Sequence, residues 1–365
     1  MPVASSRLAP VVLAATAFYA TFTLVALALH GWDPLWFVWI GERYATGDPH
    51  GRTGYDGQFI YYIARDGWAA LSHLDNPPYR LQRILLAALC RLLSGGSAPA
   101  VAWLLVAINA AAILATTALL TDWLVRHAQW RWYGLVYPLF VGTFMAYSRD
   151  LSEPLAYALA AFGAVCWLVE RRAAGVALLA LAALARETTL LFVAGLALAE
   201  LARRRWSPAA GLAAALIPML AWQLYLRAVL GTMPVASVSG WPLVPGERIF
   251  EMLSLEPGRV SALLFVGLPT LALTPLALWW VVRAPHDPLR WLVAVHCVFG
   301  LYIPTSSHLH VMAAGRTSGG LVLALVLAFP HCAPRLRAAV AALTITPTAL
   351  WLAPVLWWAP WTAKL

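Results

Sequence analysis

Long apolar segments, separated by short polar ones, run along most of the chain. About eleven segments approach the ~20 residues that a helix needs to cross a ~30 Å hydrocarbon core. They are 8–30, 99–121, 132–147, 154–169, 174–186, 188–202, 207–229, 260–282, 290–304, 317–331 and 338–357. Three or four are short, so the number carries an error of about one pair. The pattern predicts an all-α fold, a polytopic transmembrane helix bundle in which residues 1–365 form a single domain.

The composition agrees with this pattern. Hydrophobic residues make up 62% of the chain and charged residues 11%, against about 45–50% and about 25% in soluble proteins. So few charges cannot cover a soluble surface, which excludes a cytosolic enzyme, a disordered chain and a DNA-binding module. The net charge of +9 comes mostly from arginines in short loops. It therefore indicates contact with the lipid bilayer and no nucleic-acid partner.

The arginines also favour one orientation. With a cytoplasmic N-terminus, the cytoplasmic side carries Arg7, Arg126, Arg131, Arg171, Arg172, Arg203, Arg204, Arg205, Arg283, Arg290, Arg335 and Arg337. The short outer loops then carry only Arg149, Arg248 and Arg316. Basic residues concentrate in cytoplasmic loops, so we expect this orientation and an outer C-terminus. The first segment is about 20 residues long and more spans follow it, which favours an uncleaved span over a signal peptide.

Two outer loops are longer than a helix connection requires. The first, 31–98, contains aromatic clusters and two amphipathic segments, 57–67 and 79–93, which we expect to be helices at the membrane interface. In the second segment one side carries Leu81, Ile84, Leu85, Ala88 and Leu92. The other loop, 230–259, is rich in proline and glycine, which predicts irregular structure that forms a lid over a cavity.

Asp56 is the first candidate for chemistry. It lies in the first outer loop beside aromatic side chains that can stack on a sugar, with Tyr55 and Gln58 as expected substrate contacts. A carboxylate within hydrogen-bond reach of an acceptor hydroxyl can act as its general base. The alternative is a helix N-cap, because Asp is a preferred first residue before a helical run.

Arg80 and Arg83 are the second candidate. Residues three apart on a helix share a face, and two guanidinium groups on one face can bind the phosphate of a lipid carrier bidentately. The alternative is that both side chains reach ordinary anionic headgroups at the interface.

Charged residues also lie at two outer turns. Arg149, Asp150 and Glu153 fall between two apolar segments, where an ordinary polar turn is the alternative to a binding site. Arg186 and Glu187 lie in the middle of the apolar stretch 174–201. An arginine at the bilayer centre costs about 2.5–3.5 kcal/mol, so we expect a hairpin whose tip carries this pair to the outer face. A structural ion pair of Arg186 with Glu187 or Asp150 is the alternative.

The last candidates are His308, His310 and Arg316. Two histidines without a third nearby ligand are weak evidence for a metal, and contact with a pyrophosphate beside Arg316 is equally consistent. The four cysteines are scattered, which predicts buried free thiols. All of these features fall on the outer side, which favours a reaction there over a transporter, whose polar groups lie near the membrane midplane.

Residues 54–66, GYDGQFIYYIARD, resemble the YDGQ-F-Y-Y-IA signature of bacterial membrane proteins of cell-surface glycopolymer formation. They are similar to the WDG-x-WY-x-x-IA segment of the GPI mannosyltransferase V type. Ser152-Glu153-Pro154-Leu155 and residues 184–188, LARET, resemble the SEP…LARET pattern of the same group. All belong to the GT-C superfamily of polytopic glycosyltransferases. The resemblance covers about residues 10–200.

The resemblance implies an enzyme of the bacterial inner membrane that inverts the anomeric carbon. It would transfer a sugar from a polyprenyl-phosphate donor to a glycan, lipid or protein acceptor at the outer face. Asp56 would be the catalytic carboxylate, and Arg80 and Arg83 would hold the lipid phosphate. Glu153, Arg149 and Arg186 would line the same cavity. Many relatives have an acidic pair here, whereas Asp56 has no acidic neighbour within two positions, which disfavours a bound divalent metal. The alternatives are a polymerase or ligase of lipid-linked glycans, and a non-catalytic transporter or flippase.

Overall fold

The structure is a computed structural model that describes residues 2–234, 244, 267–302 and 311–357. Every regular element in this part of the chain is a helix. The first third contains α1 (Pro2–Leu29), α2 (Leu35–Val38), α3 (Glu42–Ala45), α4 (Gly57–Asp66), η1 (Gly67–His73), α5 (Pro77–Leu81), α6 (Ile84–Ser94) and α7 (Ala98–Arg126). The expectation of an all-α fold is confirmed for the described residues.

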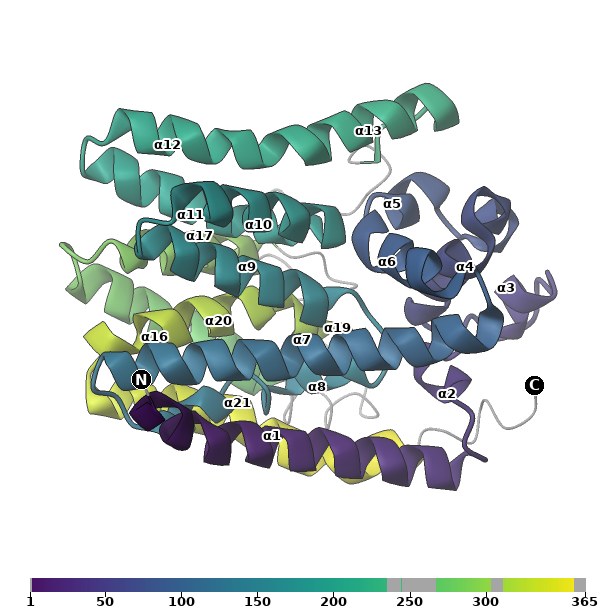
Figure 1. Ribbon diagram of the computed structural model, residues 1–365, viewed down its shortest axis with the longest axis horizontal. Helices are drawn as coiled ribbons and strands as arrows, with labels where there is room; N and C mark the ends of the chain where they lie inside the picture. Colours follow the sequence, from purple (N-terminus) through teal and green to yellow (C-terminus); the bar gives the residue numbers. More distant parts are fainter. Residues whose placement is uncertain (1, 235–243, 245–266, 303–310, 358–365) are drawn as a thin grey trace.

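The rest of the chain builds most of the bundle in Figure 1. It contains η2 (Arg131–Leu135), α8 (Val141–Tyr147), α9 (Glu153–Leu168), α10 (Arg172–Ala185), η3 (Glu187–Thr189), α11 (Leu190–Ala202), α12 (Trp206–Ala213), η4 (Ala214–Leu216), α13 (Ile217–Leu230), α16 (Leu268–Arg283), α17 (Leu289–Leu301), α19 (Val311–Thr317), α20 (Gly319–Ala328), η8 (Phe329–His331) and α21 (Pro334–Trp357). The proposed lid, 230–259, lies mostly outside the described residues.

Four helical stretches are long and apolar enough to cross a membrane: Arg7–Leu29, Ala98–Arg126, Trp206–Leu230 and Pro334–Leu356. This agrees with an integral membrane protein. Other apolar helices, such as α9, α10 and α17, have only 13 to 16 residues. The expected number of about eleven spans is therefore not confirmed.

The expected span 132–147 is wrong as a continuous helix. It divides into η2 and α8, and the stretch between them contains Pro138, which has no N–H to donate to a helix. Phe140 then adopts an extended conformation, with φ −71° and ψ 132°. Residues 136–138 and 140–147 are buried, so this segment lies inside the bundle.

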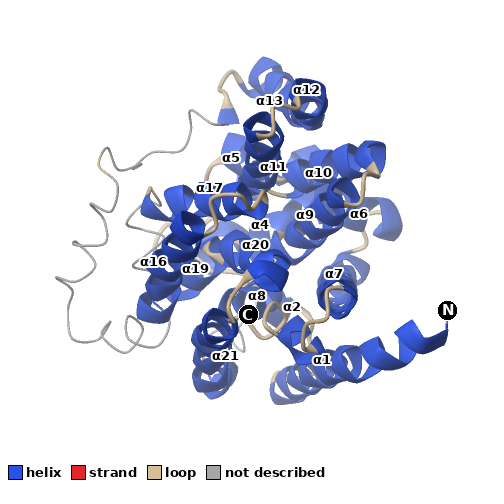
Figure 2. Cartoon of the chain, turned by 90° about the vertical axis from the view of Figure 1, so that its left-hand side faces the viewer, coloured by secondary structure: helices blue, strands red, loops and turns tan. Residues whose placement is uncertain are grey.

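The centre of the bundle is α20, all of whose residues are buried. Figure 2 shows it surrounded by other helices. Helices α9 and α10 approach each other closely at two glycines: a Cβ on Gly163 would lie 2.9 Å from the Leu179 side chain, and one on Gly175 would lie 3.0 Å from the Gly163 carbonyl oxygen. Small residues at such contacts allow the close approach typical of membrane helices.

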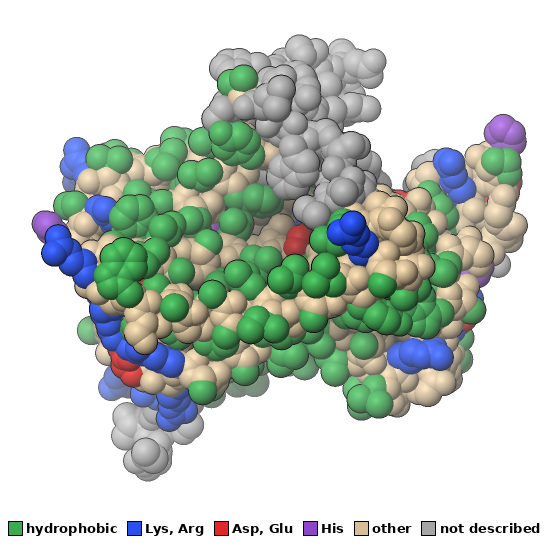
Figure 3. Space-filling view, turned by 90° about the horizontal axis from the view of Figure 1, so that it is seen from above, with side chains coloured by type: hydrophobic (Ala, Val, Ile, Leu, Met, Phe, Trp, Pro, Cys, Tyr) green, Lys and Arg blue, Asp and Glu red, His purple; other side chains and the backbone are tan. Residues whose placement is uncertain are grey.

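The two ends of the bundle differ. In Figure 1 the N-terminus and the Arg126 end of α7 lie at the left, whereas the elements between α1 and α7 lie at the right. Figure 3 shows Lys and Arg side chains gathered at the left end and hydrophobic side chains along the middle. The first loop and the arginine-rich turns are thus at opposite ends, as the predicted alternation of loops requires.

The first loop forms a small helical layer with its own core. The expected helix 57–67 is confirmed as α4. The expected helix 79–93 divides into α5 and α6 at Gln82 and Arg83, where Arg83 has φ −93° and ψ 55°. In α6 the protein-facing residues are Leu86, Ala87 and Cys90, while Leu92 is 80% exposed. Of the apolar side predicted from the sequence, Leu81 is buried and Ile84 packs against the core of this layer, whereas Ala88 and Leu92 are exposed. Only its C-terminal part therefore points away from the protein, as expected for a helix against lipid.

Candidate functional site

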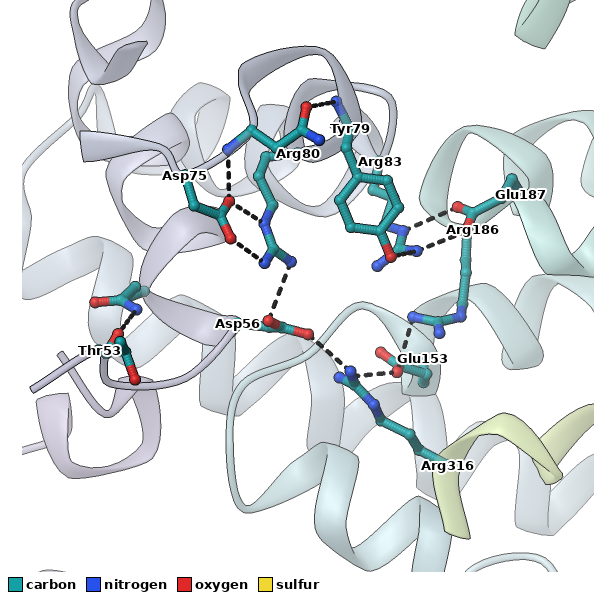
Figure 4. Close-up of polar contacts among 12 residues, drawn as sticks. Thr53, Asp56, Asp75, Tyr79, Arg80, Arg83, Glu153, Arg186, Glu187 and Arg316 are labelled. Carbon is teal, nitrogen blue, oxygen red and sulfur yellow. Dashed lines mark hydrogen bonds and ion pairs between the residues drawn. The ribbon is translucent and has the colours of Figure 1, made fainter. Parts of the chain in front are cut away.

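Asp56 lies at the N-terminus of α4 but does not cap it. Its side chain makes no capping hydrogen bond. Instead, Arg316 Nη2 donates to Oδ2 at 2.7 Å, and Arg80 Nη1 lies 3.0 Å from Oδ1 (Figure 4). The N-cap alternative is thus not what the geometry shows. The carboxylate is held between two arginines, one of which is 260 residues away in the sequence.

The backbone around Asp56 is fixed by close contacts. Gln58 is buried, its Oε1 accepts from the Gly41 N–H at 3.0 Å and its Nε2 donates to the Thr53 carbonyl at 2.6 Å. Gly54 has φ +64° and packs against Gly41, so a side chain fits at neither position. Gly57 packs against the Arg149 carbonyl oxygen. Gln58, expected to contact substrate, thus uses its amide to hold the loop that carries Asp56.

Each arginine at Asp56 also contacts a second carboxylate. Asp75 binds Arg80 bidentately, with both N–O distances 2.7 Å. Glu153 lies 3.5 Å from Arg316 Nη1 and 2.8 Å from Arg186 Nη1. Figure 4 shows the resulting row of alternating charges, which joins the first loop to the start of α9, the end of α10 and α19.

Arg83 belongs to a separate pair beside this row. Its Nε and Nη2 lie 2.9 and 2.5 Å from the two oxygens of Glu187, and Nη2 also donates to the Tyr79 hydroxyl at 2.6 Å. The Arg186–Glu187 pair considered from the sequence is therefore replaced by Arg83–Glu187 and Arg186–Glu153.

The surroundings set the ionisation of the carboxylates. Burial alone would raise the pKa of Asp56, but the guanidinium groups of Arg316 and Arg80 outweigh it and hold the pKa well below its ordinary value. In the same way Arg83 outweighs the burial of Glu187 and lowers its pKa to about 2. Burial raises the pKa of the Tyr55 hydroxyl to about 12. Both carboxylates are therefore ionised at neutral pH, and Tyr55 is neutral.

Two cavities meet at Asp56. The larger has a volume of about 700 Å³, within the ~300–1,000 Å³ usual for ligand pockets. Its wall contains Trp39, Tyr44, Tyr55, Phe59, Asp56, Arg80, Arg316, Arg52, Thr53, Gly54, Gln58, Asp75 and Ala313. The smaller measures about 20 Å³ and is lined by Asp56, Phe59, Ile60, Arg80, Arg83, Leu151, Ser152, Glu153, Arg186 and Arg316. Asp56, Phe59, Arg80 and Arg316 line both, so they form the partition between an aromatic pocket and an arginine-rich one.

Arg149 and Asp150 lie behind the site and line neither cavity. Arg149 is 1% exposed and its guanidinium carbon lies 4.8 and 4.5 Å from the ring centres of Trp36 and Trp39. Asp150 is fully buried and has φ +48°. Arg149 therefore supports the wall of the larger pocket at Trp39 rather than facing its interior.

The structure adds partners that the sequence pattern did not single out. Asp75 and Tyr79 orient the two arginines of the first loop, and Trp39 and Phe59 supply aromatic walls. Asp75 lies five residues before Arg80, and the helix that contains Arg80 begins at Pro77 with Asn76 as its cap. The opposite charges of Asp75 and Arg80 at this spacing are the sequence signal that could have indicated their pairing. His308 and His310 lie outside the described residues, and no group of three or more potential metal ligands occurs within the described part of the chain.

Comparisons with known proteins do not assign a family. The chain matches no protein-family model, no curated protein and no solved structure. The chemistry of the site is therefore inferred from its own residues.

Proposed function

We propose that the protein is a membrane glycosyltransferase of the GT-C type. It transfers a sugar from a polyprenyl-phosphate donor to a glycan, lipid or protein acceptor, at the end of the bundle that carries Asp56. The observation that carries the proposal is the Asp56 carboxylate in the partition between an aromatic pocket and an arginine-rich cavity. The motif at 54–66 adds the expected substrate class.

The aromatic pocket suits the acceptor. Trp39 and Tyr55 lie stacked at 5.9 Å, and Tyr44 meets Phe59 edge to face at 5.1 Å. Aromatic faces and edges can cover the apolar C–H surface of a sugar, while its hydroxyls reach polar groups in the same wall. An acceptor hydroxyl here would lie next to Asp56, which is ionised and 23% exposed.

The arginine-rich cavity suits the donor phosphate. Arg80, Arg186 and Arg316 line it and can stabilise the charge that develops on a departing phosphate. Inversion requires the base and the leaving group on opposite sides of the anomeric carbon. A carboxylate in the partition, with phosphate on one side and acceptor on the other, fits that requirement.

The topology completes the proposal. With the N-terminus in the cytoplasm of a bacterium, the site would face the outer side of the inner membrane. The short helices that face each other, such as α9 and α10, would complete the crossing beside the longer ones, to a total of about eleven. A donor with a long lipid tail stays in the membrane, so its phosphate must be held at the interface, where α6 exposes Leu92 and Leu93.

The test is the substitution Asp56→Asn, which keeps the shape of the side chain and removes the carboxylate that would act as the base. Purified protein in lipid vesicles receives radiolabelled polyprenyl-phosphate mannose or glucose with membrane acceptor extract, and transfer is followed over time. General-base catalysis contributes about 10²–10⁴-fold, so we expect a rate loss of that order.

The matched control is Asp66→Asn at the other end of α4, where the carboxylate pairs with Arg65 and lines neither cavity. It removes the same charge and should transfer at the unsubstituted rate. Turnover retained by Asp56→Asn would refute the proposal. Flux of the lipid-linked sugar across the vesicle without any transfer product would favour the flippase alternative.

A further inference from the structure

The carboxylates of the charged row and of the Arg83–Glu187 pair beside it are not held equally. Asp75 and Glu187 each bind one arginine with both oxygens. Asp56 instead makes one contact to each of two arginines. Bidentate pairs are more specific in geometry and stronger than single contacts. Glu153 is also held by single contacts, to Arg186 and Arg316, but it does not border the larger pocket. Asp56 is therefore the singly held carboxylate that an incoming anion can displace into open space.

Arg80 and Arg316 have N–H donors that could bind a ligand if Asp56 moved away. Asp75 occupies Nε and Nη2 of Arg80, so the edge with Nη1 is turned toward Asp56. Arg316 reaches Glu153 only at 3.5 Å, and its buried Nε has no hydrogen-bond partner among the described residues. A phosphate has more acceptor oxygens than a carboxylate and can use several of these donors at once.

The arginine-rich cavity is too small for a phosphate while Asp56 remains in place. A volume of about 20 Å³ is close to the ~10–15 Å³ that a single water requires. The larger pocket of about 700 Å³ lies on the other side of the same carboxylate. A turn of the Asp56 side chain into that pocket would enlarge the cavity and free the donors of Arg80 and Arg316 that now face Asp56.

We propose that Arg80 and Arg316 form a phosphate site that the Asp56 carboxylate occupies in the absence of ligand, so that phosphate binding releases Asp56 into the aromatic pocket. The chemical class is a phosphate mono- or diester, either on a lipid or free in solution. The sequence alone favours Arg80 and Arg83 as the phosphate clamp, but Arg83 is already bound to Glu187 and Tyr79. Arg316 takes that role instead.

The replacement of the Asp56 carboxylate by phosphate would fix the order in which donor and acceptor bind, a consequence that rests on the proposed function. Between two guanidinium groups, Asp56 is a weak base because its charged form is stabilised. Once the phosphate holds both arginines, the carboxylate faces the acceptor pocket without them and becomes more basic. The donor would therefore bind first and activate the residue that deprotonates the acceptor.

The test measures binding and needs no sugar transfer. Purified protein in lipid nanodiscs is titrated with inorganic phosphate and, separately, with farnesyl phosphate, by isothermal calorimetry. Because Asp56 competes with the ligand, Asp56→Asn should bind phosphate about tenfold more tightly or better. Asp66→Asn, with the same change of charge on the same helix, should bind as the unsubstituted protein does.

The two probes separate the sources of the phosphate. Tighter binding of both probes indicates that the phosphate group alone is recognised, and tighter binding of farnesyl phosphate only indicates a lipid headgroup; either supports the site. Unchanged or weaker binding of both by a folded Asp56→Asn would overturn it. If that variant does not fold, Arg316→Gln should lose at least about tenfold in affinity while Arg205→Gln, at the opposite end, should not. Equal losses in these two would also overturn the site.

The outcomes are independent of the transfer assay. An Asp56→Asn protein that binds phosphate more tightly and still transfers sugar keeps this site and refutes the proposed function. An Asp56→Asn protein that loses transfer without any gain in phosphate affinity supports the proposed function and refutes this phosphate site.

Discussion

At the scale of single residues, the Arg83–Glu187 pair is the firmest contact between the first loop and the tip of the α10–α11 hairpin. The Arg83 side chain is 10% exposed and that of Glu187 28%, so water screens the pair only in part. Two hydrogen bonds join them across 104 residues of sequence. Removing one residue of a largely buried pair leaves the charge of its partner buried and uncompensated. The loss of stability is therefore larger than for an ion pair that water surrounds.

We predict that the stability contributed by Glu187 depends on pH. Its pKa falls from 4.5 to about 2 on folding. This shift corresponds to a contribution of at most about 3 kcal/mol to the free energy of unfolding at neutral pH. Because the folded pKa is lowered, the contribution is fully present above pH 4.5 and is lost as the pH falls toward 2. Thermal unfolding in detergent should show Glu187→Gln less stable than the unsubstituted protein at pH 7, with the difference shrinking toward pH 3.

Glu170→Gln is the control for this pair. Glu170 binds Arg172 with its own side chain 62% exposed, and exposed pairs contribute little. It should change the unfolding temperature only slightly at either pH. A Glu187→Gln difference that stays constant from pH 7 to pH 3 would contradict the prediction.

Single residues were predictable where their neighbours in sequence carry the signal. Asp56, with aromatic residues on both sides, and the Arg80–Arg83 spacing mark the site from the sequence alone. The partner Arg316 was found only as a nearby candidate for phosphate contact, and its contact with Asp56 spans 260 residues. One sequence taken alone gives no measure of such long-range pairing. The choice between capping and binding by Asp56 also required the side-chain geometry.

At the scale of elements, α4 depends on one point of close approach. Its first residue, Gly57, lies against the carbonyl oxygen of Arg149, the residue that supports Trp36 and Trp39 from behind. The helix and the α8–α9 turn therefore fit together only when position 57 has no side chain. This contact sets the position of Asp56 relative to the turn that carries Glu153.

We predict that Gly57→Ala impairs the site through this contact. The new methyl group would overlap backbone, which cannot give way as a flexible side chain does, and overpacking costs about 1–3 kcal/mol. We expect a lower unfolding temperature and a large loss of transfer. Gly211→Ala in α12 is the matched control, because a Cβ there meets nothing within 4 Å. Its stability should be unchanged or slightly higher, since Ala favours a helix interior over Gly. Full transfer by Gly57→Ala would show that this approach does not position Asp56.

The sequence predicts some helix boundaries of the structure and misses others. The long helices α1 and α7 were predictable because uninterrupted apolar runs of this length have few other structures. The break between η2 and α8 and the division of α5 from α6 were not anticipated. Pro138 was visible, but an apolar run alone does not distinguish one crossing helix from a broken segment inside a bundle. The hairpin tip at Arg186 was predicted correctly, since its charges would otherwise lie in the bilayer.

At the scale of the whole molecule, the two ends of the bundle differ in how their charged residues are placed. At the left end in Figure 1, Glu170 binds Arg172 with its side chain largely exposed, whereas Glu200, which binds Arg205, is buried. The opposite end contains the buried row from Asp75 to Arg186 and both cavities. Burying charges is costly unless they are paired. Most of the partly buried pairs among the described residues lie at this end, which makes it the candidate site whichever way the protein is oriented.

Orientation is the last prediction. His50 lies in the first loop and Arg203 in the turn between α11 and α12, at opposite ends, and both are exposed. We predict that a membrane-impermeant maleimide added to spheroplasts of an expressing bacterium labels His50→Cys and not Arg203→Cys, because basic turns stay in the cytoplasm. Lysis should make both reactive. The unsubstituted protein is the control, since Cys90, Cys297 and Cys332 are buried and Cys166 is partly buried. Labelling of Arg203→Cys alone before lysis would place the site in the cytoplasm, where an outer-face transferase could not work.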